Sequence, residues 1–238
     1  MAINKNSNKY TIIYTVVMVV IVGALLAFLA TSLKDRQEMN VLNEQKSSIM
    51  KAFGAENGDF DKDVTVYRLK DGKSEEVKKE DVGEVFDLIS NRKELAAAED
   101  NLPYFVYERE VEENGQKFIE TLYVVPIVGK GLWGDIWGYV SLMDGNEGWE
   151  VTGIVMDHAG ETPGLGAEIA TEAVQKQFEG MRLFNGDEFA LKMLKGGKDH
   201  KEYIEGCSVD AISGGTKTCD GVNSMLENSL EKYESLFR

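Results

Sequence analysis

The nine residues DAISGGTKT, at positions 210–218, place two adjacent glycines among three hydroxyl side chains directly before an apolar-periodic segment. The glycines let the backbone approach a ligand closely or adopt positive φ. Thr216 and Thr218 fall in the first turn of the helix expected next, where free N–H groups and a partial positive charge suit a phosphate. The stretch therefore predicts a phosphate site or, as the residues alone favour, a turn followed by a helix that Thr218 caps. Its order of Gly, Lys and Thr excludes a Walker-type phosphate loop.

Two other glycine-bearing stretches have a composition that suits a flat ligand. GETPGLG, at 160–166, is a rigid loop that could cover a planar ring with Leu165 or could simply connect a strand to a helix. GKGLWGDIWG, at 129–138, carries Trp133 and Trp137, which could stack on a cofactor, contact a partner or fill the core between two strands. The residues leave these alternatives open in each stretch.

The few histidines and cysteines argue against a metal site. His158 and His200 are distant from each other in the sequence, and no zinc-type spacing links either one to Cys207 or Cys219. Two cysteines are too few for a disulfide scaffold, so two unpaired thiols are favoured over a bond formed outside the cytoplasm. Asp157 beside His158 is interpreted as a satisfied structural pair rather than an acid–base pair. We therefore predict no metal ligands and no catalytic residues.

The charge is unevenly distributed along the 238 residues. Residues 1–33 contain Lys5 and Lys9 and no acid, so residues 34–238 carry 24 basic and 41 acidic side chains, a balance of −17. A body this acidic repels nucleic acid and anionic lipid surfaces. We therefore exclude nucleic acid as a partner.

An uncharged, mostly apolar run at 11–33 is long enough to cross a membrane. As a helix it would extend about 35 Å, against a hydrocarbon core of roughly 30 Å. A cleaved signal peptide is disfavoured because its apolar region is usually about 7–15 residues long. The basic residues before the run favour, slightly, a body outside the cytoplasm. The expected organisation is a cytoplasmic terminus, a transmembrane helix, a helical stalk and an extracytoplasmic domain, at 1–10, 11–33, 34–55 and 56–238 respectively.

The body has the signals of an α+β fold. Runs rich in aromatic and β-branched residues predict strands at 64–69, 104–111, 117–125, 139–143 and 149–156. Turns are expected at Asp71-Gly72, Asn114-Gly115 and Asp144-Gly145. Apolar spacing predicts one amphipathic helix within 73–100, one at 168–178, and a closing helix with an apolar face at Val222, Met225, Leu226, Leu230 and Tyr233. With no repeat and no parallel-sheet rhythm, we predict an antiparallel sheet with packed helices.

Taken in order, the three glycine-bearing stretches resemble one family. DAISGGT resembles the flavinylation motif D-x-x-[ST]-G-A-[TS] of proteins that carry FMN on a threonine through a phosphoester bond. GKGLWGDIWGYVSL and GETPGLGAEI resemble segments of the C subunit of the sodium-translocating NADH:quinone reductase, whose layout is one span followed by an extracytoplasmic FMN domain. The related G subunit of the Rnf complex shares the ETPGLG and DAISGGT pair, and GLW…WGYVSL favours the C subunit. Gly215 stands where the family usually has alanine; only a methyl group is missing, so we expect modification to persist.

The resemblance implies covalent FMN on Thr216. Around this threonine, the residues implied to form the recognition motif and the start of the helix are Asp210, Ser213, Gly214, Gly215, Lys217 and Thr218. The residues implied to contact the isoalloxazine ring are Glu161, Thr162, Leu165, Gly166 and Trp133.

The resemblance also implies a one-electron carrier that passes electrons from an iron centre in the D and E type subunits to the FMN of the B subunit, on the way to quinone. Subunits of the A and F type would complete the complex in the inner membrane, where lipid surrounds the span, and a flavin transferase would attach the cofactor. The chain alone is expected to have no complete activity and no NADH site, since no GxGxxG follows a strand. The alternatives are the Rnf subunit and, in another class, a flavin-free membrane-anchored protein-binding module.

Overall fold

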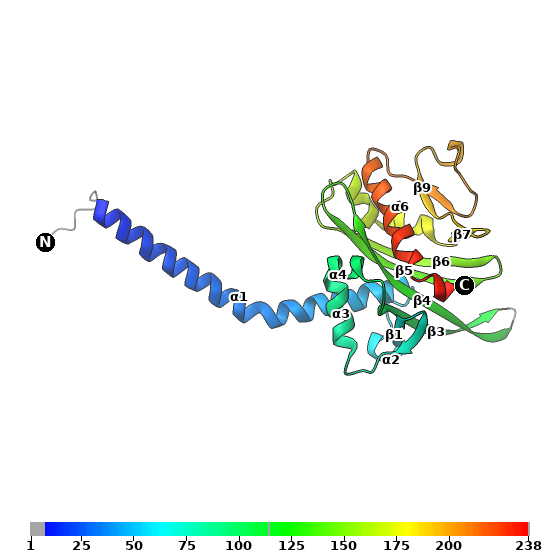
Figure 1. Ribbon diagram of the computed structural model, residues 1–238, viewed down its shortest axis with the longest axis horizontal. Coiled ribbons are helices and arrows are strands. Elements are labelled where there is room, and N and C mark those ends of the chain that lie inside the picture. Colours follow the sequence, from blue (N-terminus) through cyan, green and yellow to red (C-terminus); the bar gives the residue numbers. More distant parts are fainter. Residues whose placement is uncertain (1–7, 114, 238) are drawn as a thin grey trace. The chain divides into compact units, whose positions relative to one another are not determined.

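The computed structural model describes residues 8–113 and 115–237 (Figure 1). By its internal contacts the chain divides into two compact units, one ending at Glu44 and the other beginning at Gln45. Residues 1–7 of the expected cytoplasmic terminus and Asn114 of one expected turn lie outside the described residues.

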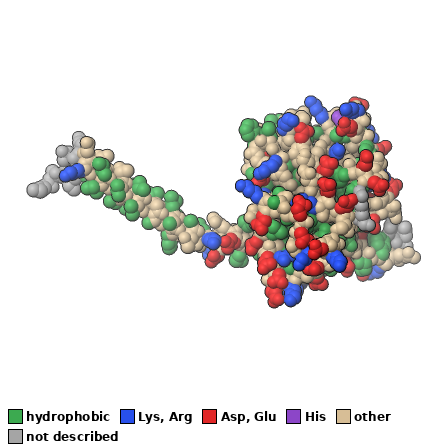
Figure 2. Space-filling view, viewed as in Figure 1, with side chains coloured by type: hydrophobic (Ala, Val, Ile, Leu, Met, Phe, Trp, Pro, Cys, Tyr) green, Lys and Arg blue, Asp and Glu red, His purple; other side chains and the backbone are tan. Residues whose placement is uncertain are grey.

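Helix α1 (Asn8–Ala52) continues without interruption through the expected span and most of the expected stalk. Between residues 11 and 33 it carries no charged side chain, and its large apolar side chains are exposed (Figure 2). Within the described residues, α1 is one helix that is long and apolar enough to cross a membrane, a test that a signal sequence also passes. The uncharged, mostly apolar run at 11–33 is therefore helical, as the sequence predicted.

The end of α1 is defined by a glycine in the left-handed region. Gly54 has φ +69°, and its N–H donates to the carbonyl of Lys51 at 3.0 Å. The N–H of Ala55 donates to the carbonyl of Met50 at 2.9 Å. This pair of bonds is a Schellman motif, which satisfies carbonyls left open by the last turn. Gly54 thus ends α1, within the segment 34–55 expected to form a helical stalk.

The main sheet is antiparallel, with strand order β2-β1-β3-β4-β5-β6. Its strands are β1 (Val64–Lys70), β2 (Lys73–Glu76), β3 (Leu102–Glu113), β4 (Gln116–Lys130), β5 (Asp135–Gly145) and β6 (Gly148–His158). This confirms the antiparallel α+β prediction and both expected strand pairs. Gly145 pairs with Gly148, so the β5–β6 turn lies at Asn146-Glu147, two residues later than predicted.

Side chains from both faces of the sheet are buried, because adjacent residues of a strand point to opposite sides. On β3, Tyr104 belongs to the large apolar cluster that includes α6. The next residue, Phe105, contacts the rings of Phe60 and Phe86 on the other side. At Gly153 a side chain would overlap the carbonyl of Ala52, so the end of α1 lies directly against β6.

The prediction of a single helix within 73–100 is wrong. Asp71 and Gly72, both with positive φ, turn the chain into β2, and two short helices follow, α3 (Val82–Ser90) and α4 (Arg92–Ala97). Asn91 separates them and accepts a hydrogen bond from the N–H of Glu94 as the cap of α4. The expected apolar face exists, but only within α3, where Val85, Phe86 and Ile89 are buried.

The remaining elements are short, apart from the closing helix. The helix expected at 168–178 is instead three short pieces: η1 (Gly166–Ala170), α5 (Glu172–Gln175) and η2 (Lys176–Phe178). Extended Thr171 separates η1 from α5, and η2 is a 3-10 turn that directly continues α5. The other small elements are α2 (Phe60–Asp63), β7 (Phe184–Asn185), β8 (Glu188–Phe189), β9 (Lys192–Leu194), η3 (Gly197–Asp199), β10 (Ser208–Asp210) and α7 (Glu234–Phe237). β9 and β10 form a parallel pair that the sequence did not predict. The closing helix is α6 (Thr216–Glu231), with the expected apolar face buried.

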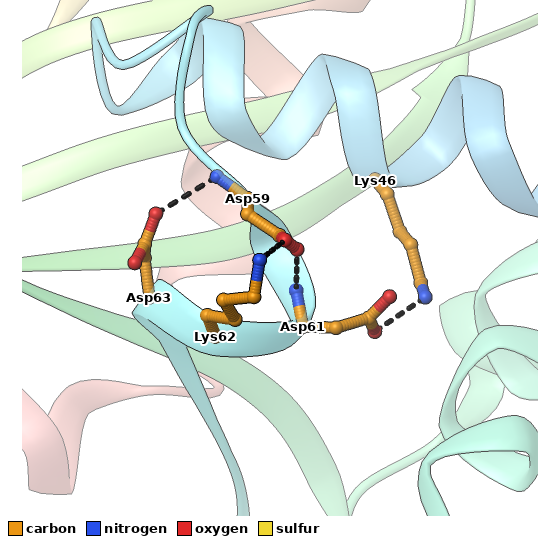
Figure 3. Close-up of polar contacts among 5 residues, drawn as sticks. All are labelled: Lys46, Asp59, Asp61, Lys62 and Asp63. Atoms are coloured by element: carbon orange, nitrogen blue, oxygen red, sulfur yellow. Dashed lines mark hydrogen bonds and ion pairs between the residues drawn. The ribbon is translucent and has the colours of Figure 1, made fainter.

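A set of exposed ionic contacts joins the C-terminal part of α1 to α2 (Figure 3). Asp59 caps α2 by accepting from the N–H of Asp61 at 3.2 Å, and its carboxylate also accepts from Lys62 at 2.5 Å. The hydrogen bond from Lys62 holds the pKa of Asp59 below its usual value. Lys46 of α1 pairs with Asp61 at 2.6 Å. These contacts link the C-terminal part of α1 to α2. Because the pairs are exposed, they contribute little to the free energy of unfolding.

Tyr233 offers a measurable test of the core beside α6. Its ring is fully buried, which raises the pKa of its hydroxyl, and the hydroxyl donates to the carbonyl of Pro103 at 2.7 Å. Tyr233→Phe leaves that carbonyl without its partner, so we expect the free energy of unfolding to fall by about 1–2 kcal/mol. Urea unfolding of the full chain in detergent measures this, and an unchanged midpoint would contradict the buried bond.

Candidate cofactor site

The three glycine-bearing stretches meet at the side chain of Glu161. This residue lies in the loop after β6 and is 4% exposed. Its Oε1 accepts a hydrogen bond from the N–H of Trp133 at 2.8 Å, and its Oε2 accepts from the hydroxyl of Thr218 at 2.6 Å. Its own N–H donates to Nδ1 of His158 at 3.2 Å. One buried carboxylate therefore ties the β4–β5 loop and the first turn of α6 to the loop after β6.

Two glycines make room for this carboxylate and its partner. A Cβ at Gly166 would overlap both Thr218 Oγ1 and Glu161 Oε2, and a Cβ at Gly131 would lie 2.5 Å from Glu161 Oε1. The backbone at these two positions is not in the left-handed region. Glycine is needed here because the carboxylate and the hydroxyl lie against the backbone of both neighbouring loops.

The first turn of α6 presents Thr216 to solvent. Gly215 is the N-cap, and no side chain caps the helix. The preceding turn closes when the N–H of Gly215 donates to the carbonyl of Ile212 at 3.1 Å, with Gly214 at φ +77°. Thr216 is the first helical residue and its side chain is exposed. An exposed hydroxyl thus stands where a helix offers free N–H groups and a partial positive charge.

Thr218 does not have the role that the residues alone favoured. It is 2% exposed and donates to Glu161, so it does not cap α6. It lies two positions after Thr216 in the same turn, with its hydroxyl directed into the protein. The prediction of a capping threonine is therefore wrong, because a buried carboxylate from a distant loop captures the hydroxyl.

An exposed apolar surface borders this first turn. Its residues are Leu132, Trp133 and Leu165, and Trp133 is 69% exposed. Leu165 reaches the turn before α6, because a Cβ at Gly214 would lie 2.6 Å from Leu165 Cδ2. Trp137, by contrast, is partly buried under the guanidinium of Arg92, 3.3 Å from its ring centroid. Of the two tryptophans, Trp133 is the one free to contact a flat ring.

The other expected site residues lie around the same turn. Thr162, Ser213 and Lys217 are exposed, and Lys217 pairs with Asp220 at 3.2 Å. Asp210 ends β10, where its N–H donates to Gln177 at 3.1 Å. Its carboxylate lies against Gly197, whose Cβ, if present, would overlap it.

Two pairs of residues, Asp157 with His158 and Cys207 with Cys219, were not expected to do chemistry. Asp157 accepts from the N–H of His158 at 2.7 Å, while Nδ1 of His158 accepts from Glu161, so the two side chains support the loop. Cys207 and Cys219 are both buried and unpaired, as predicted. Among the described residues, no group of histidine, cysteine, aspartate or glutamate side chains could hold a metal ion.

Known proteins are similar to this chain in both sequence and fold. Residues 131–231, which include the 160–166 and 210–218 stretches and all of the 129–138 stretch except Gly129 and Lys130, match the FMN-binding domain family. The C subunit of the Na(+)-translocating NADH-quinone reductase of Haemophilus ducreyi is 32% identical over 94% of this chain and 90% of its own length. The chain belongs to the family of Na(+)-translocating NADH-quinone reductase C subunits. This confirms the resemblance seen in the sequence.

Two further members of the C-subunit family extend the comparison. The Chlamydia caviae protein is 39% identical over 129 residues, 48% of this chain, and the match spans only 39% of that protein's length. The crystal structure of the C subunit from Parabacteroides distasonis aligns with a TM-score of 0.63 at 28% identity, covering 86% of this chain and 96% of that one. The α+β fold is therefore that of the solved C-subunit structure.

The residues of this C-subunit family member fit an FMN phosphate. The exposed Thr216 hydroxyl stands at the N-terminal end of a 16-residue helix, beside a turn that uses positive φ at Gly214. The first N–H groups of α6 and the Lys217 ammonium are the donors that a phosphate needs. The apolar Leu165 and Trp133 side chains beside the turn suit a flat ring. An exposed hydroxyl, unpaired helix donors and an apolar border together match a phosphate joined to an isoalloxazine.

Proposed function

We propose that this chain carries FMN covalently on Thr216 and acts as an electron-relaying subunit of a sodium-translocating NADH:quinone reductase. The observation that carries the proposal is the opposite placement of two neighbouring threonines. Thr216 is exposed at the start of α6, whereas Thr218 is buried and engaged with Glu161. Only the first has a hydroxyl that a transferase can reach.

In this proposal the chain's own residues hold and orient the cofactor. Thr216 would hold the FMN phosphate as a diester: its oxygen would bond the phosphorus and lose its proton while the bond from that phosphorus to the leaving nucleotide of the transferase's flavin donor breaks, and the diester would keep one negative charge. Lys217 and the first N–H groups of α6 stabilise that charge. Gly214, which is exposed, leaves the turn open to the transferase, Gly215 lets the chain pack closely against Ile212, and Leu165 and Trp133 provide apolar contacts for the ring. When bound, FMN supplies one-electron transfer between one-electron centres.

The proposal includes a place for the chain in its complex. Residues 11–33 of α1 anchor it in lipid of the inner membrane, residues 34–55 form a stalk, and the domain from 56 onward lies in the periplasm with the N-terminus in the cytoplasm. The domain receives electrons from the iron-bearing D and E type subunits and delivers them to the flavin of the B subunit, which leads to quinone. A covalent bond suits this location because a cofactor lost from the periplasm is difficult to replace.

Mass spectrometry of the protein purified from its own membranes tests the proposal. Trypsin separates the two threonines, since cleavage after Lys201 and Lys217 gives 202–217 with Thr216 and cleavage after Lys232 gives 218–232 with Thr218. We expect the mass of FMN less one water on the first peptide, with fragment ions placing it on Thr216. If modification blocks cleavage after Lys217, the peptide 202–232 carries it instead, and fragment ions still assign the threonine. An unmodified Thr216 peptide from a colourless protein would contradict the proposal.

A further inference from the structure

The hydrogen bonds of Glu161 assign this residue a task other than contact with a flavin ring. Its carboxylate is almost fully buried, and one oxygen accepts from Thr218 while the other accepts from the N–H of Trp133. Both donors are neutral groups of the chain itself. A buried carboxylate is costly unless donors satisfy it, so this arrangement has to be maintained by both partners.

We propose that Glu161 and Thr218 form a latch, the Glu161–Thr218 latch, that positions Thr216 for flavin attachment. The two residues are 57 positions apart in the sequence, and their hydrogen bond of 2.6 Å is the buried link between the loop after β6 and the first turn of α6. Both are positioning residues rather than cofactor ligands. The inference rests on the proposed function, because it concerns which threonine receives FMN.

Helix geometry connects the latch to the acceptor. Successive residues of an α-helix are about 100° apart around the axis, so Thr216 and Thr218 point about 200° apart. When Glu161 holds Thr218 inward, Thr216 is turned outward on the same turn. The latch therefore selects the acceptor, because it removes one of two nearby hydroxyls from solvent and presents the other.

The latch also holds the loop that carries Trp133. Glu161 Oε1 accepts from the Trp133 N–H, and Gly131 donates to the carbonyl of Gly134 at 2.8 Å, so the β4–β5 loop is closed on itself and tied to the same carboxylate. A change at Glu161 should thus loosen this loop even when no flavin is attached. That consequence gives a measurement independent of FMN.

The test compares matched variants in a flavinylation assay. The full chain is expressed without a transferase and purified in detergent, then given a purified flavin transferase and its flavin nucleotide substrate. The initial rate of FMN incorporation is read by intact mass. Glu161→Gln supplies only one amide oxygen for two donors, and Thr218→Val keeps the shape but removes the hydroxyl. We expect each to lower the rate about fivefold or more, as for loss of one hydrogen bond to a charged group.

Two further variants separate positioning from general stability. Thr218→Ser retains the hydroxyl and should keep the rate within about twofold of the unaltered chain. Tyr233→Phe also loses a buried hydrogen bond, but Tyr233 follows the C-terminal end of α6, at the opposite end of the helix from Thr216. This variant should therefore also leave the rate within about twofold of the unaltered chain. In Glu161→Gln, FMN on the 218–232 peptide, which contains Thr218, would also show that the chain no longer selects Thr216 as the acceptor.

A second measurement uses the flavin-free chain. Lys130 directly precedes the β4–β5 loop, and we expect trypsin to cleave after it about fivefold faster in Glu161→Gln than in the unaltered chain. If the unaltered chain takes FMN on Thr216 and all variants do so at its rate, the latch is refuted while the proposed function stands. If the unaltered chain takes no FMN, the proposed function fails, and unchanged cleavage after Lys130 would then refute the latch as well.

Discussion

Thr216→Ala is expected to give a folded chain that carries no covalent flavin. The substitution removes the only oxygen through which the side chain can form a phosphoester, and alanine is a favourable residue for the first turn of a helix. In the described part of the chain, the Thr216 side chain is exposed and α6 has no side-chain cap, so little stability depends on the hydroxyl. The loss of flavin should therefore be complete, with the free energy of unfolding changed by less than about 0.5 kcal/mol.

Two measurements on the same sample check this result. Flavin fluorescence of the denatured band on a gel reports covalent attachment, and intact mass reports its stoichiometry. Thr218→Ser is the matched control, since it alters the neighbouring threonine but retains the hydroxyl that Glu161 holds. Fluorescence that persists in Thr216→Ala would mean that another residue is the acceptor, and peptide mapping would then identify it.

Gly166→Ala is the substitution expected to cost most stability at the site. The added Cβ would overlap the Thr218 hydroxyl and the Glu161 carboxylate at once. Both lie in a buried hydrogen bond, so the chain must either strain the backbone or break that bond around a buried charge. We expect the free energy of unfolding to fall by about 2–4 kcal/mol, as for an overpacked site that also loses a buried hydrogen bond.

Gly215→Ala is the matched control for this prediction. Its Cβ would meet Ile212 Cγ2 at 3.1 Å and Ile212 Cβ at 3.2 Å, so residue Ile212 must shift by a few tenths of an ångström, whereas Gly166 N, at 3.6 Å, is at ordinary contact distance. Its φ of −100° is ordinary for alanine. We therefore expect a cost of less than about 1 kcal/mol. Urea unfolding followed by tryptophan fluorescence compares the two variants, and equal midpoints would refute the steric role of Gly166.

Local patterns predicted the parts of the fold that depend on neighbouring residues. The aromatic and β-branched runs of β3 and β4, with Asn114-Gly115 between them, predicted their pairing, and the spacing from Val222 to Leu230 predicted α6. These signals lie within single elements or a short turn. Strand β2 was missed because all four of its residues are exposed, so its sequence has no apolar alternation. The segment from Glu168 to Phe178 was interpreted as one helix, since its spacing is helical, but Thr171 is extended and divides it.

In the candidate site, the sequence indicated the residue that lies in a local motif but not the hydrogen bonds between distant loops. The DAISGGT motif led to Thr216, and the structure adds that its side chain is exposed. Glu161 was expected to contact the flavin ring, whereas its carboxylate is occupied by Thr218 and the Trp133 amide. Those bonds join residues 28 and 57 positions apart, which local spacing does not encode. The one available signal was a lone glutamate in a loop with three glycines, of which Gly166 lies against its carboxylate.

The burial of the two thiols gives the domain a built-in reporter of its opening. Burial raises the pKa of both Cys207 and Cys219, so neither is a ready nucleophile while the chain is folded. An alkylating reagent should therefore label them only when the surrounding structure separates. The Cys219 sulfur also accepts a hydrogen bond from the N–H of Ile212, in the turn that precedes α6. Its rate of labelling therefore reports local opening of this turn and of the first turn of α6, which presents Thr216. The rate at which a thiol reagent labels the folded protein would therefore measure how often this part of the domain opens.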